Sequence, residues 1–321
     1  MTQKPTPFLS LRKPVCPPEL LQLARMRPKP RVIIARAGGN LPMQAAKEAT
    51  EAGIMLPMFT GERDDILRAA DTLEWDIADY PLLETKGEEE AGLIAASACG
   101  AGDADVLMKG QIPSDLFLKT ALNRSAGLRS GNRLVHIFHI THPDGGKPLL
   151  VSDAAVNVSP DIQTRRACTT AVIDLLAALG NNNPKIAFLS ASEKPLPSMP
   201  SAVEARELQI WAQQQFEHVA FSGPLALDLI LSRESAAIKG LHNDPVAGDA
   251  DAIIVPDIVS GNAVFKSLVY LSGGCAGGLI TGARVPLLLT SRSDPPAARL
   301  ASIALAGIAR AALAEKQARD D

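Results

Sequence analysis

Residues 159–190 read SPDIQTRRACTTAVIDLLAALGNNNPKIAFLS and contain one helix pattern followed by one strand pattern. Ser159 and Pro160 are a cap residue and a proline of the kind that opens a helix. Apolar residues then recur at helical spacing as far as Leu179, and Gly180 ends the pattern. The apolar run at 186–189 is typical of a buried strand. This stretch therefore predicts a helix that packs against a parallel sheet.

The same alternation extends over most of the chain. The N-terminal region is either a tail or a short leading helix at 18–25, and another helix opens at Ser201 with Glu204 in capping-box position. Apolar, branched runs typical of strands occur at 31–35, 56–60, 106–108, 134–140, 149–151, 186–189, 219–222, 252–255 and 285–290. Strands that alternate with helices indicate an α/β fold with a largely parallel sheet covered on both faces.

Residues 134–151 depart from the alternation. Two strand patterns are separated there only by a Pro/Asp/Gly-Gly turn, which favours an antiparallel hairpin. We interpret the hairpin as the passage from a first domain into a second. The pattern leaves open to which domain the last strand, 285–290, and the Ala-rich helix at 296–314 return.

Composition excludes several classes of protein. The chain has 321 residues, which suffices for two α/β domains, and its net charge of −3 comes from interspersed acids and bases. Nucleic-acid binding needs a concentrated basic face, so we expect no nucleic-acid partner. Four distant cysteines, with no CxxC pair, predict reduced core thiols (Cys16, Cys99, Cys168 and Cys275).

No membrane or export segment is expected. The N-terminal 30 residues lack the apolar run of a signal peptide, which predicts a cytoplasmic protein. The uncharged segment 267–283 is short and Gly-rich for a membrane span. We interpret it as a close-packed buried helix.

Candidate site residues follow the strands, because ligands of such sheets bind beyond the carboxyl ends of the strands. The groups at those ends are hydroxyl, amide or charged, as an anionic ligand requires: Lys109-Gly110, Ser152-Asp153 with Asn157, Ser190, Ser192-Glu193, Gly223-Pro224 and Ser291-Arg292. Arg292 is the sharpest candidate, since a guanidinium offers a planar fork to phosphate. The alternative is a surface arginine that caps the next helix or pairs with Asp294.

Three other motifs favour structural roles. Gly38-Gly39 follows the first strand without a GxGxxG pattern, so a dinucleotide loop is not expected. His136, His139 and His142 lie in a strand-like run that sends His139 to the opposite face, which disfavours a metal site. Ser291 lacks a GxSxG context, so a Ser–His hydrolase is not expected.

An ordered set of motifs resembles the phosphate acetyl/butyryltransferase family, and in particular its butyryl-type branch. The set covers roughly the last two-thirds of the chain: VLMKG at 106–110, Leu118-Lys119, GLR at 127–129, SDAAVN at 152–157, PKIAFLS at 184–190, GPLALD at 223–228, VAGDAD at 246–251, Gly261-Asn262 with Lys266, and TSRSD at 290–294.

The resemblance implies a fold and a reaction. It implies two three-layer α/β domains of the isocitrate/isopropylmalate dehydrogenase type, residues 1–133 plus 283–321 and residues 134–282, with the active site in the interdomain cleft. It implies reversible transfer of a short acyl group, acetyl or butyryl, between coenzyme A and inorganic phosphate. Coenzyme A is a substrate, and no permanent cofactor or metal is implied. A homodimer and an enoyl-CoA hydratase-like partner are further expectations.

The resemblance also assigns roles to residues. Ser291, Arg292 and Asp294 are the implied catalytic residues. Phosphate or coenzyme A contacts are implied for Lys109, Gly110, Lys119, Asp153, Asn157, Asn262 and Lys266. One departure concerns the base: the acetyl branch carries an acid on the helix after its Ser-Arg pair, whereas residues 295–299 contain none. Asp294 is the carboxylate nearest in sequence.

Two other functions remain open at this point. One is an oxidoreductase on the same fold, for which Asp249 and Asp251 are the nearest equivalent of a metal-binding aspartate cluster. The other is a non-catalytic module that binds coenzyme A.

Overall fold

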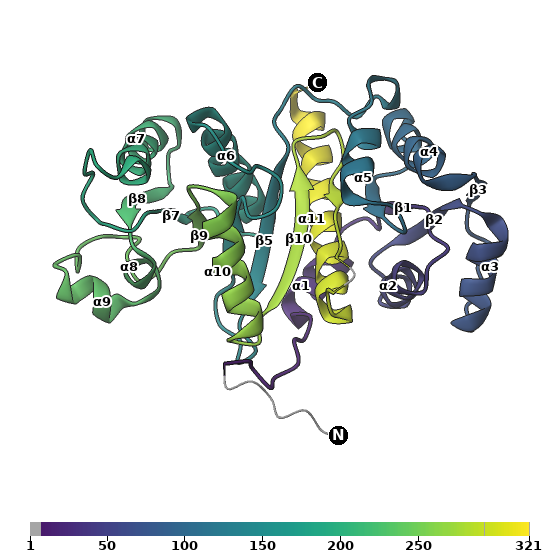
Figure 1. The fold of residues 1–321 in the computed structure, drawn as a ribbon, viewed down its shortest axis with the longest axis horizontal. Coiled ribbons are helices and arrows are strands. Elements are labelled where there is room, and N and C mark those ends of the chain that lie inside the picture. Colours follow the sequence, from purple (N-terminus) through teal and green to yellow (C-terminus); the bar gives the residue numbers. More distant parts are fainter. Residues whose placement is uncertain (1–7, 292, 321) are drawn as a thin grey trace. The chain divides into compact units, whose positions relative to one another are not determined.

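The computed structural model describes residues 8–291 and 293–320, and these residues form two compact units (Figure 1). The first unit comprises Val15–Leu134 and Gly277–Asp321. The second unit comprises Val135–Ala276 together with the N-terminal residues up to Pro14. Each unit is an α/β structure in which helices pack against a mixed sheet.

The sheet of the first unit has the strand order β3-β2-β1-β4-β11-β10. All neighbouring strands are parallel except β10, which runs antiparallel to β11. Ala35 pairs with Lys109, and Leu288 pairs with Met108, so β1, β4 and β11 end at one edge. The strands are β1 (Arg31–Ala35), β2 (Leu56–Gly61), β3 (Leu82–Glu84), β4 (Val106–Lys109), β10 (Cys275–Thr281) and β11 (Leu287–Leu288).

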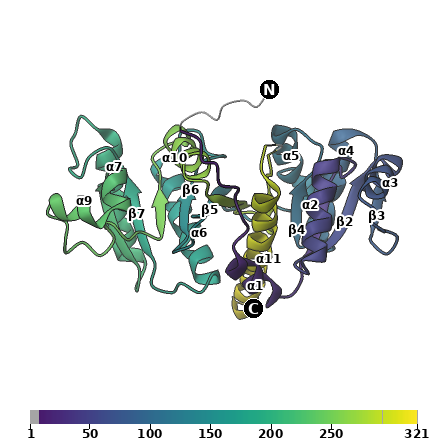
Figure 2. The same ribbon diagram turned by 90° about the horizontal axis from the view of Figure 1, so that it is seen from below.

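Helices pack on both faces of this sheet (Figure 2). Helix α11 contacts α1 and α2, whereas α4 contacts α5 together with strands β1 and β2. The helices are α1 (Pro18–Arg25), α2 (Asn40–Glu51), α3 (Arg63–Thr72), α4 (Gly87–Ala101), α5 (Ser114–Ala121), the 3-10 turn η1 (Arg124–Ala126) and α11 (Pro296–Asp320).

The sheet of the second unit has the order β5-β6-β9-β7-β8. β5 and β6 form an antiparallel hairpin, and the other pairs are parallel. The strands are β5 (Val135–Thr141), β6 (Leu149–Ser152), β7 (Lys185–Leu189), β8 (Ala220–Leu225) and β9 (Ala252–Ile254). The helices are α6 (Ile162–Ala178), α7 (Pro200–Gln215), α8 (Leu227–Leu231), α9 (Arg233–Ile238) and α10 (Ile258–Tyr270).

Several predictions from sequence are confirmed. The leading helix and the hairpin at 134–151 are present, as α1 and as β5–β6. The ends of α6 and α7 differ in detail. Asp161, not Ser159, caps α6 by accepting from Thr164 N, and Gly180 ends the helix at φ +91°. The prediction of a capping box at Ser201 was wrong, because α7 already begins at Pro200 and the Glu204 carboxylate pairs with Arg165 instead.

The interpretation of 267–283 as a buried helix was wrong. Helix α10 ends at Tyr270, and the chain then turns through Gly273 (φ +76°) into strand β10. A Cβ at Gly277 would lie 3.0 Å from the backbone of Ala301 in α11. Glycine in β10 therefore lets helix α11 lie close to the strand. The poor helix propensity of glycine also disfavours a helix in this segment.

Two strands differ from the prediction. The strand predicted at 285–290 is regular only at Leu287–Leu288, and β3 was not predicted, since two of its three residues are exposed.

Within the described ranges, one helix, Pro296–Arg319, is long and apolar enough to span a membrane. More than half of its apolar window (56%) is buried inside the structure, as in the core helix of a globular protein.

Candidate functional site

Lys109 lies at the end of β4 and is almost fully buried. Its ammonium lies 3.3 Å from the carbonyl oxygen of Ile112 and 3.5 Å from that of Gly110. The loop that follows the strand therefore folds around the ammonium of its own first residue. This arrangement holds a cation at the carboxyl edge of the first unit's sheet, the place where an anionic ligand of such a sheet binds.

Gly110 is required by close backbone packing. A Cβ at this position would lie 2.4 Å from the carbonyl oxygen of Arg36 and 2.5 Å from that of Ala35. Gly110 N donates to the Ala35 oxygen at 2.9 Å, so the loop is held against the end of β1. No larger residue fits here without a backbone shift.

The segment after β11 reaches the same edge of the sheet. Ser291 is exposed, and its hydroxyl lies 3.0 Å from that of Ser293. The carboxylate of Asp294 accepts from Ser291 N at 2.7 Å, which closes a turn before α11. The predicted Arg292 lies outside the described residues. The structure thus brings Lys109 and Ser291 to one edge and gives the Asp294 carboxylate a backbone partner.

Lys119 lies in the last turn of α5. Its ammonium pairs with Glu89 of α4 at 3.3 Å, and both side chains are more than two-thirds exposed. An exposed pair of this kind adds about 0–1 kcal/mol to stability. Lys119 can therefore exchange Glu89 for an anionic ligand at little cost.

In the second unit, Asp153 lies at the end of β6 and is buried. Its carboxylate accepts from the backbone of His136 (3.0 Å), Ala155 (2.9 Å) and Val156 (2.9 Å), and from Asn157 Nδ2 (2.6 Å). Four donors satisfy the acceptor capacity of a carboxylate. Asp153 therefore shapes the β6–α6 loop and positions Asn157, and it has no lone pair left for a ligand.

Asn262 and Lys266 lie four residues apart on α10 and share a face. The helix approaches the β6–α6 loop closely, since a Cβ at Gly261 would lie 2.9 Å from the Asp153 carbonyl oxygen. The Lys266 ammonium is exposed and lies 5.5 Å and 5.8 Å from the ring centroids of Phe265 and Tyr270. The structure therefore brings Asn262 close to Asp153 in the fold and leaves Lys266 at the surface.

The sequence profile of the family described as "Phosphate acetyl/butaryl transferase" matches residues 85–306. A phosphate acetyltransferase of Rhizobium meliloti is 34% identical over 290 residues, which is 90% of this chain and 92% of that protein. A phosphate butyryltransferase of Clostridium acetobutylicum is 31% identical over 90% of this chain and 96% of its own length. The chain belongs to this family. The crystal structure of a branched-chain phosphotransacylase from Enterococcus faecalis superposes with a TM-score of 0.78 at 31% identity, over 87% of this chain and 98% of the other.

Every site residue predicted from the sequence lies inside the range matched to the phosphate acetyl/butyryltransferase family. The range begins at residue 85, so the profile leaves out β1 and the loop that follows it.

The aspartates that favoured an oxidoreductase have another role. Asp249 pairs with Lys185 (2.6 Å), Arg233 (2.7 Å) and Lys147 (3.0 Å), and Asp251 pairs with Lys147 at 2.8 Å. Asp251 also accepts from Lys185 N, the first residue of β7. Both carboxylates thus lie where β7 and β9 begin, at the edge of the sheet opposite to the one where ligands bind. Lysine and arginine side chains already pair with them. They are structural residues, not a metal-binding pair.

The three histidines are also explained by the fold. His136 and His139 are buried in β5, and burial lowers the pKa of His139 to about 4. His142 lies in the hairpin turn, where its Nδ1 accepts from Asp144 N at 3.2 Å. Across the parts of the chain that the structure describes, no three His, Cys, Asp or Glu side chains gather as a metal site.

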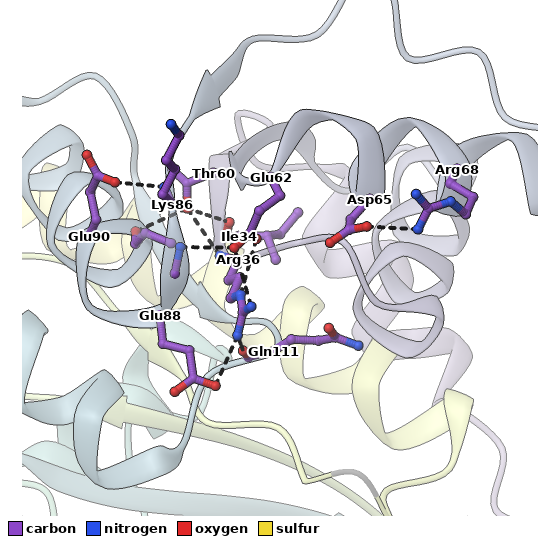
Figure 3. Close-up of polar contacts among 12 residues, drawn as sticks. Ile34, Arg36, Thr60, Glu62, Asp65, Arg68, Lys86, Glu88, Glu90 and Gln111 are labelled. Carbon is purple, nitrogen blue, oxygen red and sulfur yellow. Dashed lines mark hydrogen bonds and ion pairs between the residues drawn. The ribbon is translucent and has the colours of Figure 1, made fainter.

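Sequence reasoning missed two arginines. Arg36, directly after β1, makes ion pairs with Glu62 and Glu88 beside Gln111, two residues after Lys109 (Figure 3). Arg165 of α6 is fully buried, and Glu204 binds its Nη1 at 3.0 Å. The position of Arg36, a basic residue directly after a predicted strand and before Gly38-Gly39, was a weak sign of its role. Arg165 carried a sign in the helix pattern, since it lies three residues before Cys168 and seven before Val172, on the apolar face that packs into the core.

Proposed function

We propose that this protein catalyses the reversible transfer of a short acyl group between coenzyme A and inorganic phosphate. Membership of the phosphate acetyl/butyryltransferase family over most of the chain carries the proposal. The buried ammonium of Lys109 at a sheet edge supports it, because the reaction handles an anion at every stage.

The chemistry makes two demands on the site. Phosphate attacks the thioester carbonyl in one direction, and the coenzyme A thiolate attacks the acyl phosphate carbonyl in the other. A thiol has an ordinary pKa near ~8.5, so the thiolate must be favoured and the phosphate charge neutralised. We assign phosphate binding to Lys109, with its loop at Gly110, and transition-state charge stabilisation to Arg292.

The remaining residues have supporting roles in this proposal. Ser291 positions the thiol or a phosphoryl oxygen, and Asp294 is the candidate base for the thiol. Lys119 and Lys266 supply exposed cations for the phosphates of coenzyme A. Asn157 and Asn262 donate hydrogen bonds to a substrate, and Asp153 holds Asn157 in place.

The wider setting is proposed on the same basis. We assign the two compact units, Val15–Leu134 with Gly277–Asp321 and Val135–Ala276 with the residues up to Pro14, to two domains of the isocitrate/isopropylmalate dehydrogenase type. A cytoplasmic homodimer, with coenzyme A as a substrate and an enoyl-CoA hydratase-like protein as a partner, completes the proposal. Light scattering tests the dimer, since a mass near the 33.8 kDa of one chain contradicts it.

A thiol-release assay tests the function. The purified protein is incubated with acetyl-, propionyl-, butyryl- or isobutyryl-CoA, with and without phosphate, and free thiol is measured. Phosphate-dependent release with at least one substrate is expected. Coenzyme A binding without any release indicates the non-catalytic module instead.

A further inference from the structure

The loop at 109–112, called the Lys109 loop here, is attached to the end of β1 by its backbone. Gly110 N donates to the oxygen of Ala35 at 2.9 Å, and Gln111 N donates to that of Arg36 at 2.8 Å. The side chain of Gln111 lies directly over Gly39, where a Cβ would be 2.0 Å from Nε2. The position of the Lys109 ammonium therefore depends on the conformation of residues 35–39.

Arg36 has an unusual backbone in this segment. Its φ is +58°, in the left-handed region, which a side-chain-bearing residue adopts at a cost of about 1–2 kcal/mol. Thr60 is fully buried and offsets part of this cost, since its Oγ1 accepts from Arg36 N at 3.2 Å. Strained backbone of this kind persists where the surroundings fix it, and it gathers at functional sites.

The guanidinium of Arg36 is fixed by two carboxylates (Figure 3). Nε and Nη2 donate to the two oxygens of Glu62 at 3.2 and 3.3 Å, and Nη1 donates to Glu88 at 3.0 Å. Glu62 is itself held, because it accepts from Gly87 N at 2.9 Å. Nη1 also reaches the carbonyl oxygen of Gln111 at 3.5 Å. The side chain of Arg36 thus ties the Lys109 loop to α4 and to the turn before α3.

We propose that Arg36 is a positioning residue for phosphate binding, which holds the Lys109 loop through the fork made with Glu62 and Glu88. The inference rests on the proposed function. Arg36 is not the phosphate ligand itself, because two carboxylates occupy its donors and would repel an anion. Its effect on phosphate passes through the loop to Lys109.

Arg36→Lys tests the inference, since lysine keeps the charge and loses the planar fork. We expect the KM for phosphate to rise about tenfold, because the variant loses the equivalent of roughly one charge-assisted hydrogen bond. We expect kcat and the KM for acyl-CoA to change by less than about twofold, because the reacting groups are untouched. The control is Arg68→Ala, which removes an exposed pair with Asp65 on neighbouring α3 and leaves the kinetics unchanged. An unchanged KM for phosphate in a folded Arg36→Lys overturns the inference.

Arg36→Gly provides a second variant if lysine destabilises the fold. Glycine adopts φ +58° freely, so this variant removes the fork and relieves the strain. The same rise in KM for phosphate is expected. A double-mutant cycle with Lys109→Met separates indirect from direct action. If Arg36 acts through Lys109, the Arg36→Lys effect disappears in the Lys109→Met background, whereas additive effects overturn the inference.

Amide hydrogen exchange gives a readout that needs no activity. Exchange at Gly110 and Gln111 should become about tenfold faster in Arg36→Lys and stay unchanged in Arg68→Ala. Absence of acyl transfer by the unmutated protein contradicts the proposed function, whereas unchanged exchange in Arg36→Lys contradicts the role of Arg36 in holding the Lys109 loop. The two failures are therefore distinguishable.

Discussion

The carboxylate of Asp249 lies 2.6 Å from the ammonium of Lys185, the first residue of a central strand of the second unit. Lys185 and Lys147 donate hydrogen bonds to Asp249, and these lower its pKa to about 2. The group is about a quarter exposed (26%), so water weakens the interaction only in part. The pair stabilises the end of the sheet away from the candidate site.

Asp249→Asn should lower the free energy of unfolding by about 1–2 kcal/mol at neutral pH. The folded pKa lies below the ordinary value, so the contribution is present above pH ~4 and is lost as pH falls toward ~2. Denaturant unfolding from pH 7 to pH 2 should therefore show the two proteins converge in acid. Asp65→Asn, which removes an exposed pair with Arg68, serves as control. An equal gap at pH 7 and at pH 2 contradicts the assignment.

Two buried histidines should make the protein sensitive to mild acid. Burial lowers the pKa of His136 and of His139, in the latter to about 4. The unfolded chain then binds protons from pH ~6.5 downward while the folded chain does not, so stability falls between pH 6.5 and 4. His139→Gln should flatten this part of the stability profile, and an unchanged slope between pH 6.5 and 4 argues against the prediction. His142→Gln, at an exposed position, should leave the profile unchanged.

Gly110→Ala should damage both the fold and phosphate binding. The new methyl group would meet two backbone carbonyl oxygens at 2.4 and 2.5 Å, so the Lys109 loop must move. Overpacking of this kind costs about 1–3 kcal/mol, and we expect a higher KM for phosphate in any folded fraction. Gly307→Ala in α11 is the matched control, because its nearest neighbours lie at 3.4 Å or beyond. Helix propensity there favours a gain of about 0.5–1 kcal/mol. A stable Gly110→Ala protein with an unchanged KM for phosphate would contradict the close packing of the Lys109 loop against the end of β1.

Arg292→Lys should reduce kcat far more than it raises the KM for acyl-CoA. If the guanidinium stabilises charge that develops in the transition state, its loss costs roughly a hundred- to thousandfold in rate. Ser291→Ala should cost less, since a neutral hydroxyl makes a weaker hydrogen bond. Steady-state kinetics with saturating phosphate measures both variants. Turnover near that of the unmutated protein in a folded Arg292→Lys contradicts the role of this residue.

Sequence periodicity was enough to predict the alternation of strands and helices, because buried apolar runs and amphipathic helices leave direct patterns. It failed between Ser267 and Ala283, where small uncharged residues fit a buried helix and a close-packed strand equally well. It also failed at β3, whose exposed residues show no apolar pattern.

The candidate site was predictable where a strand ends in a charged or polar residue, as at Lys109 and Asp153. Arg36 was not predictable, since its role depends on a left-handed backbone and on carboxylates 26 and 52 residues away. The buried position of Asp153 also could not be read from its type, because the four donors that satisfy it come from β5 and from its own loop.

The most direct test of the account is a product balance with ³¹P NMR. The protein is mixed with butyryl-CoA and inorganic phosphate, and acyl phosphate and free thiol are measured in the same sample. The account predicts acyl phosphate and thiol in equal amounts, and their reconversion to butyryl-CoA when acyl phosphate and coenzyme A are supplied instead. Thiol release without acyl phosphate, at a rate independent of phosphate, would identify a thioesterase and contradict the account.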